Sequence, residues 1–413
     1  MRIETAGAPD SQFSILNSQF RIAVVGPVFP FRAGIAYCTT RLAEELKADV
    51  VSYKRQYPRR FYPGGDDIDP TLPRAKADFV LDIVNPITWI RAGLRLRKYD
   101  TVIFVWWIWV WAIPVRAMMA MLSSRTRVIL QCHNIGDKEP AWWKRWLTNR
   151  VLRRADVLVV HTRSEASEAW ERSHGRRTVT TFLPVHELGG PVPSRDEARA
   201  MLNVTAKNVA LFFGHVRPFK ALDVVLHAWR ELKSDVLLLV AGEAWWKSED
   251  EYRKLADELG LAVVPSESEG SGRVGSVTVP PAAQVPRFAR DDMRRVRFDF
   301  RFIPDEEIAT WFAACDVVLA PYRIEAQSGV ALTAFHFARP VIASTVGGLP
   351  EIIEPGRNGL LVPPDDPRAL AQAIDDFFAR DDRATMEQNG AESALQYSWP
   401  EYARVFERLV SHG

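Results

Sequence analysis

The sequence predicts an α/β protein made of two Rossmann-like domains. Apolar, strand-like runs alternate with helix-like segments through the first half of the chain, and the same alternation restarts after residue 200. This alternation is typical of a parallel sheet covered by helices on both faces. A chain of 413 residues is also long for one hydrophobic core, which favours two domains.

The elements of the first half follow one another in strand-helix order. We expect strands at 21–26, 48–53, 101–106, 127–132, 156–161 and 178–182, and helices at 34–47, 86–98, 112–123, 140–154 and 164–174. Residues 1–20 are interpreted as a disordered or accessory tail. The first domain is therefore expected at 21–190, followed by a linker at 189–199, where Gly, Pro and charged residues gather.

The second half repeats the pattern, and a second domain is expected at 200–390. Its predicted strands are 208–216, 235–243, 316–322 and 339–345, with helices at 220–232 and 305–315. Residues 264–292 lack periodicity and are rich in Ser, Gly and Pro, so a flexible insertion is expected there. An amphipathic helix at 398–410 is expected to form a C-terminal segment, 395–413, that packs across the domains.

Composition excludes several classes of protein. A net charge of +2 argues against a bulk nucleic-acid binder, and the longest apolar run, 102–115, is shorter than the ~20 residues of a membrane-spanning helix. No His, Cys or carboxylate spacing suits a metal, so neither a metal nor another cofactor is predicted. The three cysteines lie far apart in the sequence, each among apolar residues. We therefore expect buried free thiols and a reducing, cytoplasmic compartment.

Two cations follow the first strand of the second domain. Gly214 ends this strand, and Arg217 and Lys220 lie three residues apart just before a helix. A helix N-terminus already carries partial positive charge, so two cations there are unfavourable unless an anion lies between them. A pyrophosphate has the right size and charge. The alternative is that both side chains point into solvent.

The segment 320–351 reads as strand, acidic turn, helix, strand and Gly-Gly loop. The hydroxyl and backbone N–H groups at the start of its helix suit a phosphate. Glu325 either accepts hydrogen bonds from sugar hydroxyls or is a helix-capping acid. An ordinary β-α-β unit with turn glycines is also compatible with this segment. The residues that would contact the ligand at the helix start are Gln327, Ser328, Gly329 and Val330.

The first domain contributes fewer candidates. Gly34 begins a helix after the turn that follows the first strand. This loop either faces a diphosphate or sugar or is only a tight connection between strand and helix. His133 and Asn134 follow the strand VILQC, at a carboxyl edge where ligands commonly bind, although a lone histidine is more often structural.

Two Trp-rich stretches allow two interpretations each. The basic stretch 142–154 either contacts anionic lipid headgroups or, as we expect, is a surface helix packed on its sheet. Trp106, Trp107, Trp109 and Trp111 either stack on a sugar or lipid acceptor or fill the core.

Taken together, these motifs resemble the retaining glycosyltransferases of family 4, which have the GT-B fold. The resemblance covers roughly residues 21 to 410 and includes the signatures GGLPE at 347–351 and NGLLVPPDDP at 358–367. It implies two Rossmann-like domains facing each other across a cleft, the second binding a nucleotide sugar and the first an acceptor. It also implies that Arg217 and Lys220 neutralise the donor diphosphate, with Gly34 near the phosphates and His133 near the donor sugar.

One position departs from the family pattern. The family carries two glutamates separated by seven intervening residues; Glu325 matches the first, whereas Thr333 stands at the second. The resemblance assigns this second position to the nucleotide ribose, where a threonine hydroxyl offers a neutral contact only. The QSGV run and the His-Asn pair look like a subgroup that also lacks the second glutamate, so the departure does not imply inactivity.

The activity implied by the resemblance is sugar transfer from a nucleoside diphosphate sugar to a hydroxyl acceptor with retention, in glycan or polysaccharide assembly. His133 and Glu325 would be the catalytic residues, with Asn134, Gln327 and Thr333 near the nucleotide or sugar. The expected partners are the donor and a glycan or lipid-linked acceptor, without nucleic acid, and with room for peripheral contact at the inner membrane face. The alternatives are a silent nucleotide-sugar-binding or scaffold subunit and a GT-B epimerase.

Overall fold

In the computed structural model, contacts divide the chain into two compact units. The first comprises Met1–Pro184 and Tyr397–Gly413, and the second Val185–Gln396. The residues that the structure describes are 4–5, 20–32, 34–57, 67–70, 72–136, 141–186, 191–244, 249–264, 294–324 and 327–411.

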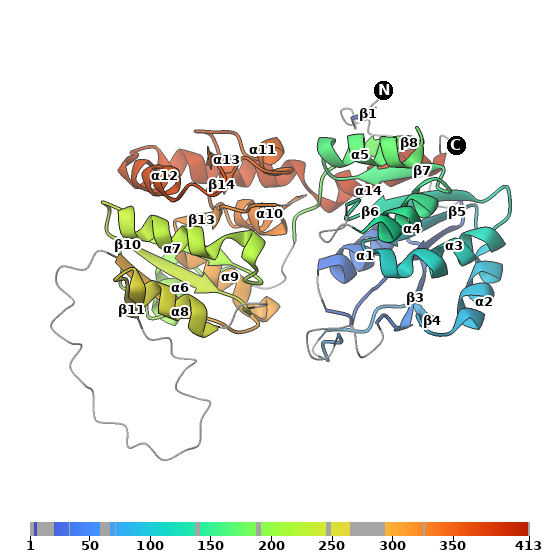
Figure 1. Cartoon of the computed structure of the whole chain (residues 1–413), viewed down its shortest axis with the longest axis horizontal. Coiled ribbons are helices and arrows are strands. Elements are labelled where there is room, and N and C mark those ends of the chain that lie inside the picture. The colour runs from blue at the N-terminus through green and yellow to red at the C-terminus, as the bar shows by residue number, and fades with distance from the viewer. Residues whose placement is uncertain are drawn as a thin grey trace, which may run out of the picture. The chain divides into compact units, whose positions relative to one another are not determined.

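The first unit contains an eight-stranded, parallel sheet in the order β1-β8-β7-β6-β5-β2-β3-β4 (Figure 1). Its central strands are apolar throughout, as expected for strands covered on both faces. The strands are β1 (Glu4–Thr5), β2 (Ile22–Val25), β3 (Asp49–Arg55), β4 (Asp78–Asp82), β5 (Thr101–Trp106), β6 (Arg127–Cys132), β7 (Val157–Val160) and β8 (Arg177–Thr180).

Helices cover this sheet, and the last of them comes from the far end of the chain. They are α1 (Gly34–Glu45), α2 (Pro86–Leu96), the 3-10 turn η2 (Trp109–Trp111), α3 (Ala112–Met121), α4 (Trp142–Leu152), α5 (Arg163–Ser173) and α14 (Trp399–Ser411). The side chains of α14 complete the core of the first unit. Gln131 Nε2 donates to Tyr402 Oη at 2.7 Å, and Tyr402 Oη lies 3.0 Å from His161 Nε2.

The second unit has a seven-stranded parallel sheet in the order β11-β12-β10-β9-β13-β14-β15. Its strands are β9 (Val209–Phe213), β10 (Val236–Ala241), β11 (Ala262–Val264), β12 (Arg294–Asp299), β13 (Val317–Ala320), β14 (Val341–Ser344) and β15 (Gly359–Val362). Its helices are α6 (Arg195–Met201), η3 (Pro218–Lys220), α7 (Leu222–Glu231), α8 (Glu249–Glu258), α9 (Asp305–Ala314), α10 (Gly329–His336), α11 (Leu349–Ile352), α12 (Pro367–Ala379) and α13 (Arg383–Gln396).

The structure differs from the expected element map in several places; strands β4 and β12, for example, were not expected. The segment expected as a linker at 189–199 contains the start of α6, because Ser194 and Glu197 form a capping box there. Two residues of the expected tail form β1, which pairs with β8. The flexible insertion expected at 264–292 lies outside the described residues except for Val264, which ends β11.

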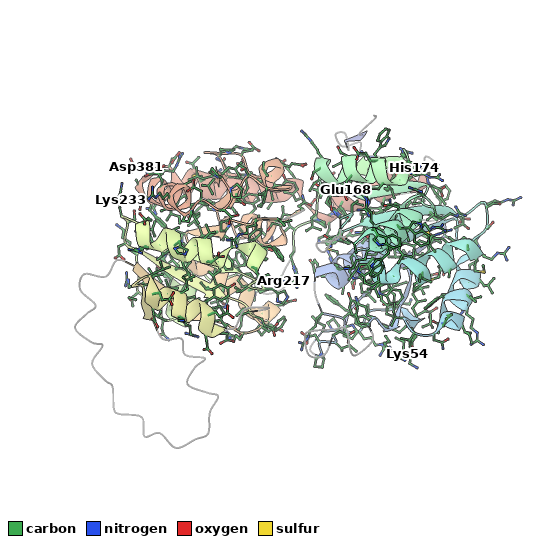
Figure 2. All side chains as sticks on the ribbon, viewed as in Figure 1. Lys54, Glu168, His174, Arg217, Lys233 and Asp381 are labelled. Carbon is green, nitrogen blue, oxygen red and sulfur yellow. The ribbon has the colours of Figure 1, made fainter. Side chains whose placement is uncertain are left out.

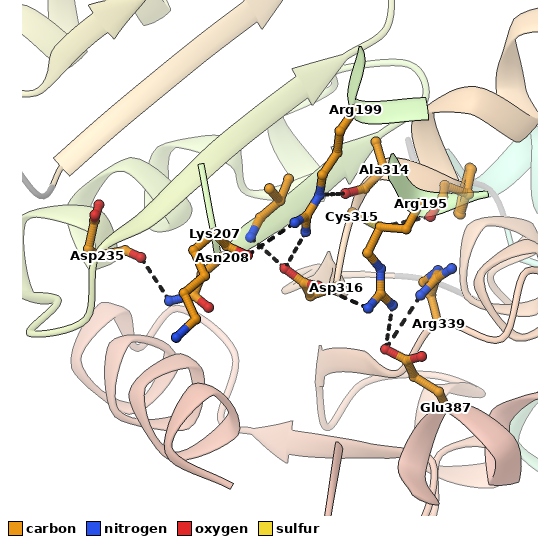
Figure 3. Close-up of polar contacts among 12 residues, drawn as sticks. Arg195, Arg199, Lys207, Asn208, Asp235, Ala314, Cys315, Asp316, Arg339 and Glu387 are labelled. Atoms are coloured by element: carbon orange, nitrogen blue, oxygen red, sulfur yellow. Dashed lines mark hydrogen bonds and ion pairs between the residues drawn. The ribbon is translucent and has the colours of Figure 1, made fainter. Parts of the chain in front are cut away.

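A charge network lies at the amino ends of β9 and β13 (Figure 3). The Asp316 carboxylate accepts the Val209 amide at 2.7 Å and an Arg199 N–H at 2.9 Å, and Arg195 joins it to Glu387. These contacts satisfy a buried carboxylate at the edge of the sheet opposite to where parallel sheets bind ligands. The network therefore has a structural role.

The expectation that the three cysteines are buried is confirmed. Cys38, Cys132 and Cys315 are buried free thiols. Of the four neighbouring tryptophans, Trp106, Trp107 and Trp111 are buried in the first core and belong to its packing, whereas Trp109 is half-buried. Across the described residues, no helix combines the length and apolar character needed to cross a bilayer. These residues also hold no cluster of side chains suited to a metal ion.

Candidate functional site

The second sheet has a topological switch point beside β9. The chain proceeds from β9 to β10 on one side and later returns to β13 on the other side. In open parallel sheets, ligands bind at such a point, outside the carboxyl ends of the strands. The turn that holds Arg217 and Lys220 leaves β9 at this point, and the segment leading to α10 leaves β13 beside it.

The backbone is tightly packed where β9 and β10 end. Gly214 has a φ of +89° and Gly242 a φ of +138°, both in the region that favours glycine. A Cβ on Gly242 would lie 2.3 Å from the carbonyl oxygen of Gly214. Gly214 N also donates to Ala241 O at 2.9 Å. The start of the cation-bearing turn is thus fixed by main-chain contacts.

Lys220 is brought to the end of β9 and to the start of α10. A Cβ built on Gly214 would meet Lys220 Nζ at 3.5 Å and Val330 Cγ2 at 3.6 Å. The same ammonium lies 5.0 Å from the centroid of the Tyr322 ring. Two residues predicted from separate sequence motifs, Lys220 and Val330, therefore converge on one point.

His215 was not predicted from the sequence, and its pKa is affected by the positive charge of this turn. Burial and the charges of Arg217 and Lys220 lower its pKa to about 4, although Glu243 opposes the shift. The imidazole is consequently neutral at pH 7. The turn concentrates positive charge without a third cation, which suits a polyanionic ligand.

Arg323, also missed, holds the turn in place. Its guanidinium donates to Pro218 O at 2.6 Å, to the Asp223 carboxylate at 3.0 and 2.8 Å, and to Asp365 Oδ1 at 2.6 Å. Its backbone N–H donates to Phe219 O at 2.7 Å. Arg323 thereby links the end of β13 to the turn after β9, and its own charge is satisfied by carboxylates.

The start of α10 offers backbone N–H groups. Ser328 is the N-cap and is buried, and its Oγ accepts the Ala331 amide at 3.3 Å. The first-turn amides of Gly329 and Val330 have no partner within an α-helix, as at any helix start. This bond uses the Ser328 oxygen only as an acceptor, so its hydroxyl proton, like the two amides after it, can still donate to an anion.

The remaining nucleotide-side candidates differ in their surroundings. Thr333 is buried, and its Oγ1 donates to Gly329 O at 2.8 Å, so its hydroxyl proton is already committed. Gln327 is half-buried beside Ser328. Glu325 lies outside the described residues.

Asn358, within the second signature, has a structural role. Its Nδ2 donates to Ile352 O at 3.1 Å and to Ser393 Oγ at 3.0 Å, and its Oδ1 accepts the Glu354 amide at 2.8 Å. The side chain is fully buried, so these bonds satisfy its polar groups inside the fold.

The first-unit candidates also lie at carboxyl edges. Gly34 opens α1 at an exposed position, and a Cβ there would meet no atom within 4 Å. His133 follows β6, and its ring lies 5.1 Å from that of His161. Burial lowers the pKa of His133 to about 4, and its buried Nε2 has no hydrogen-bond partner among the described residues. Asn134 Nδ2 lies 3.5 Å from Trp107 O.

Comparison with known sequences identifies relatives. The model of the family described as "Glycosyl transferases group 1" matches residues 207–380. A D-inositol 3-phosphate glycosyltransferase of Nocardioides sp. is 32% identical over 342 residues, which cover 78% of this chain and 65% of that protein. The enzyme of that name from Streptomyces scabiei is 30% identical, covering 75% and 67%. The chain therefore spans about two thirds of the length of these relatives.

Comparison with solved structures identifies the same architecture. Sucrose-phosphate synthase from Thermosynechococcus elongatus has a TM-score of 0.68 at 20% identity, over 95% of this chain and 100% of that one. Anabaena HepE in complex with UDP has a TM-score of 0.68 at 16% identity, with the same coverage. These likenesses concern the fold. The chain has the two parallel-sheet α/β units of the GT-B class and shares its sequence pattern with these relatives. It therefore belongs to the glycosyl transferases group 1 family.

Proposed function

We propose that this chain transfers a sugar from a nucleoside diphosphate sugar to a hydroxyl acceptor with retention of anomeric configuration. The observation that carries the proposal is the convergence of Lys220 and the α10 start at the switch point beside β9, with Arg217 in the same turn. A diphosphate matches this arrangement, because it places two anionic groups within reach of cations and helix amides. The complexes of HepE with UDP and with UDP-glucose support a donor of this class.

The proposed chemistry depends on stabilising the leaving diphosphate. The bond between the anomeric carbon and the diphosphate oxygen breaks, and the acceptor oxygen forms the new bond on the same face. The acceptor proton passes to the departing phosphate oxygen. Arg217, Lys220 and the amides of Gly329 and Val330 would oppose the negative charge that develops there.

The other candidate residues would orient the donor. His133 is neutral at pH 7, so it would act towards the sugar as a hydrogen-bonding group rather than as a cation. Because the Thr333 hydroxyl already donates its hydrogen bond to Gly329 O, its oxygen can only accept from a ribose hydroxyl. Glu325 would accept hydrogen bonds from sugar hydroxyls. The acceptor we propose is a glycan or a lipid-linked oligosaccharide.

Two lysine variants test the site: Lys220→Met removes the charge at the proposed site, and Lys233→Met is the control. Figure 2 shows Lys233 on the side of the second unit away from Arg217, so its loss removes the same charge without touching the proposed site. Calorimetric titration with UDP, GDP and ADP identifies the base. For the preferred nucleotide, Lys220→Met should raise Kd about 10- to 100-fold, since a hydrogen bond to a charged group contributes about 1.5–3 kcal/mol. Lys233→Met should leave Kd unchanged.

Turnover distinguishes the alternatives. Nucleoside diphosphate release that requires an acceptor, with an NMR coupling constant showing retention, supports the transferase. Donor binding without release indicates a silent binding subunit, and an isomerised sugar nucleotide without transfer indicates an epimerase. Equal nucleotide affinity in wild type and Lys220→Met contradicts the site itself.

A further inference from the structure

Three helices of the first unit, α2, α3 and α4, form a row on one face of its sheet (Figure 1). Helices α2 and α3 approach closely, since a Cβ on Gly93 would lie 2.9 Å from Met118 O. Each of the three helices precedes a strand of the same parallel sheet, so all three begin at its carboxyl edge.

Large apolar side chains are exposed along this row. Trp142 is 82% exposed, Trp146 50% and Ile113 59%. We define the α2–α4 surface as the exposed apolar residues of these helices, which are Ile87, Ile90, Leu94, Ile113, Trp142, Trp143 and Trp146. Four of these lie in the first turn of their helix, at the carboxyl edge, whereas α4 packs inward through Thr148, Val151 and Leu152. Helix packing therefore holds α4 but leaves its tryptophans outside, and an exposed apolar cluster of this kind marks an interaction surface.

The charge of the same helices is of one sign. Helices α2, α3 and α4 contain no Asp or Glu, so none of them has a carboxylate in its own first turn. This excess is local, because the whole chain carries only +2. The cations on the three helices are Arg91, Arg95, Arg116, Lys144, Arg145 and Arg150.

Arg95 is paired with Asp78, with 3.6 Å between Nη1 and Oδ2, but Arg116 has an unsatisfied guanidinium nitrogen. Its Nη1 is buried and has no hydrogen-bond partner among the described residues. Burial lowers its pKa, and the nearby guanidinium groups of Arg154 and Arg150 lower it further. A group of arginines without a carboxylate is stabilised by external anions.

Tryptophans and cations alternate at close range. The Arg150 guanidinium lies 4.1 Å from the Trp146 ring centroid, and the Trp109 and Trp143 rings meet edge to face at 4.6 Å. At a bilayer surface, indole rings reside at the headgroup level while Arg and Lys reach the phosphates. Both requirements are met on adjacent turns of α4.

We propose that the α2–α4 surface docks on the headgroup layer of a bilayer that contains anionic phospholipid. The absence of carboxylates from the three helices, the unsatisfied Arg116 and the spread of apolar side chains over three helix starts fit a flat layer of phosphates better than a protein partner with its own mixed charges. This docking is independent of which sugar the chain transfers.

Cosedimentation with vesicles tests the electrostatic part. The full chain should bind vesicles of phosphatidylcholine with about 30 mol % phosphatidylglycerol more tightly than phosphatidylcholine alone, and salt should weaken the binding. Arg145→Gln/Arg150→Gln should lower the partition coefficient about 25-fold, at about fivefold for each cation. The matched control Lys233→Gln/Lys254→Gln, on the second unit, should bind as wild type.

A second pair tests the tryptophans. Trp142→Ser/Trp146→Ser should lose vesicle binding and the fluorescence quenching caused by brominated lipid, whereas Leu395→Ser, an exposed apolar residue of α13, should lose neither. An unchanged Tm shows that the variants fold. Equal binding to neutral and anionic vesicles, wild-type binding by either α4 variant, or self-association without vesicle binding overturns the proposal.

Discussion

Arg323 makes a testable link between stability and the proposed donor site. Arg323→Met removes the paired hydrogen bonds to Asp223, at 3.0 and 2.8 Å, the bond to Pro218 O and the ion pair with Asp365. Asp365 is 57% exposed, so that pair is expected to contribute below about 1 kcal/mol. The half-buried Asp223 pair and the carbonyl bond should each contribute about 1–1.5 kcal/mol. We expect a loss of about 3 kcal/mol in the free energy of unfolding.

A double-mutant cycle in urea unfolding measures the pairwise part of this energy. Arg323→Met and Asp223→Asn should show a coupling energy of about 1–1.5 kcal/mol, because the two side chains contact each other directly. Asp365→Asn, the control, should couple to Arg323 by less than about 1 kcal/mol. Since Arg323 holds the turn that carries Lys220, the variant should also bind nucleoside diphosphate more weakly. Zero coupling with Asp223, together with unchanged nucleotide affinity, would refute the assignment of Arg323 as the residue that fixes this turn.

Two further predictions concern the first unit. Tyr402→Phe should lower the free energy of unfolding in urea by about 2–3 kcal/mol, because it leaves buried groups of Gln131 and His161 without their partner; a change below about 0.5 kcal/mol would contradict this. Burial lowers the pKa of His133 from 6.5 to about 4, so the unfolded chain binds its proton first as the pH falls, and stability present above pH 6.5 is lost towards pH 4. Between pH 7 and pH 5, the free energy of unfolding in urea should fall by about 2 kcal/mol less in His133→Asn than in wild type. An equal fall in both proteins would show that His133 does not contribute.

The parallel sheets were predictable because their central strands are buried on both faces and read as continuous apolar runs. Strand β12 was missed for the opposite reason. Its sequence, RRVRFD, is mostly charged, and Arg297 is buried because its guanidinium donates to Leu202 O in a distant part of the unit. Hydrophobic periodicity cannot register a strand whose buried arginine is satisfied by a contact far along the chain.

The candidate site was predictable for the residues whose position follows from the local order of strands, turns and helices. Lys220 and Val330 each stand at a strand-to-helix turn, and the parallel sheet brings these turns to one edge. Arg323 was not predictable, because its role depends on carboxylates at positions 223 and 365 that fold against it. The α4 tryptophans were interpreted as part of a packed helix, since sequence alone does not say which face of a short helix turns inward.

The return of α14 to the first unit constrains the order of events during synthesis. Residues 1–184 leave the ribosome before the second unit does, yet the partner of Gln131 and His161, Tyr402, is translated after all of Val185–Gln396. The second unit can therefore acquire its complete core while the first still waits for its last helix. Until then the apolar surface that α14 covers is open to solvent, so the nascent first unit stays prone to aggregation until translation ends.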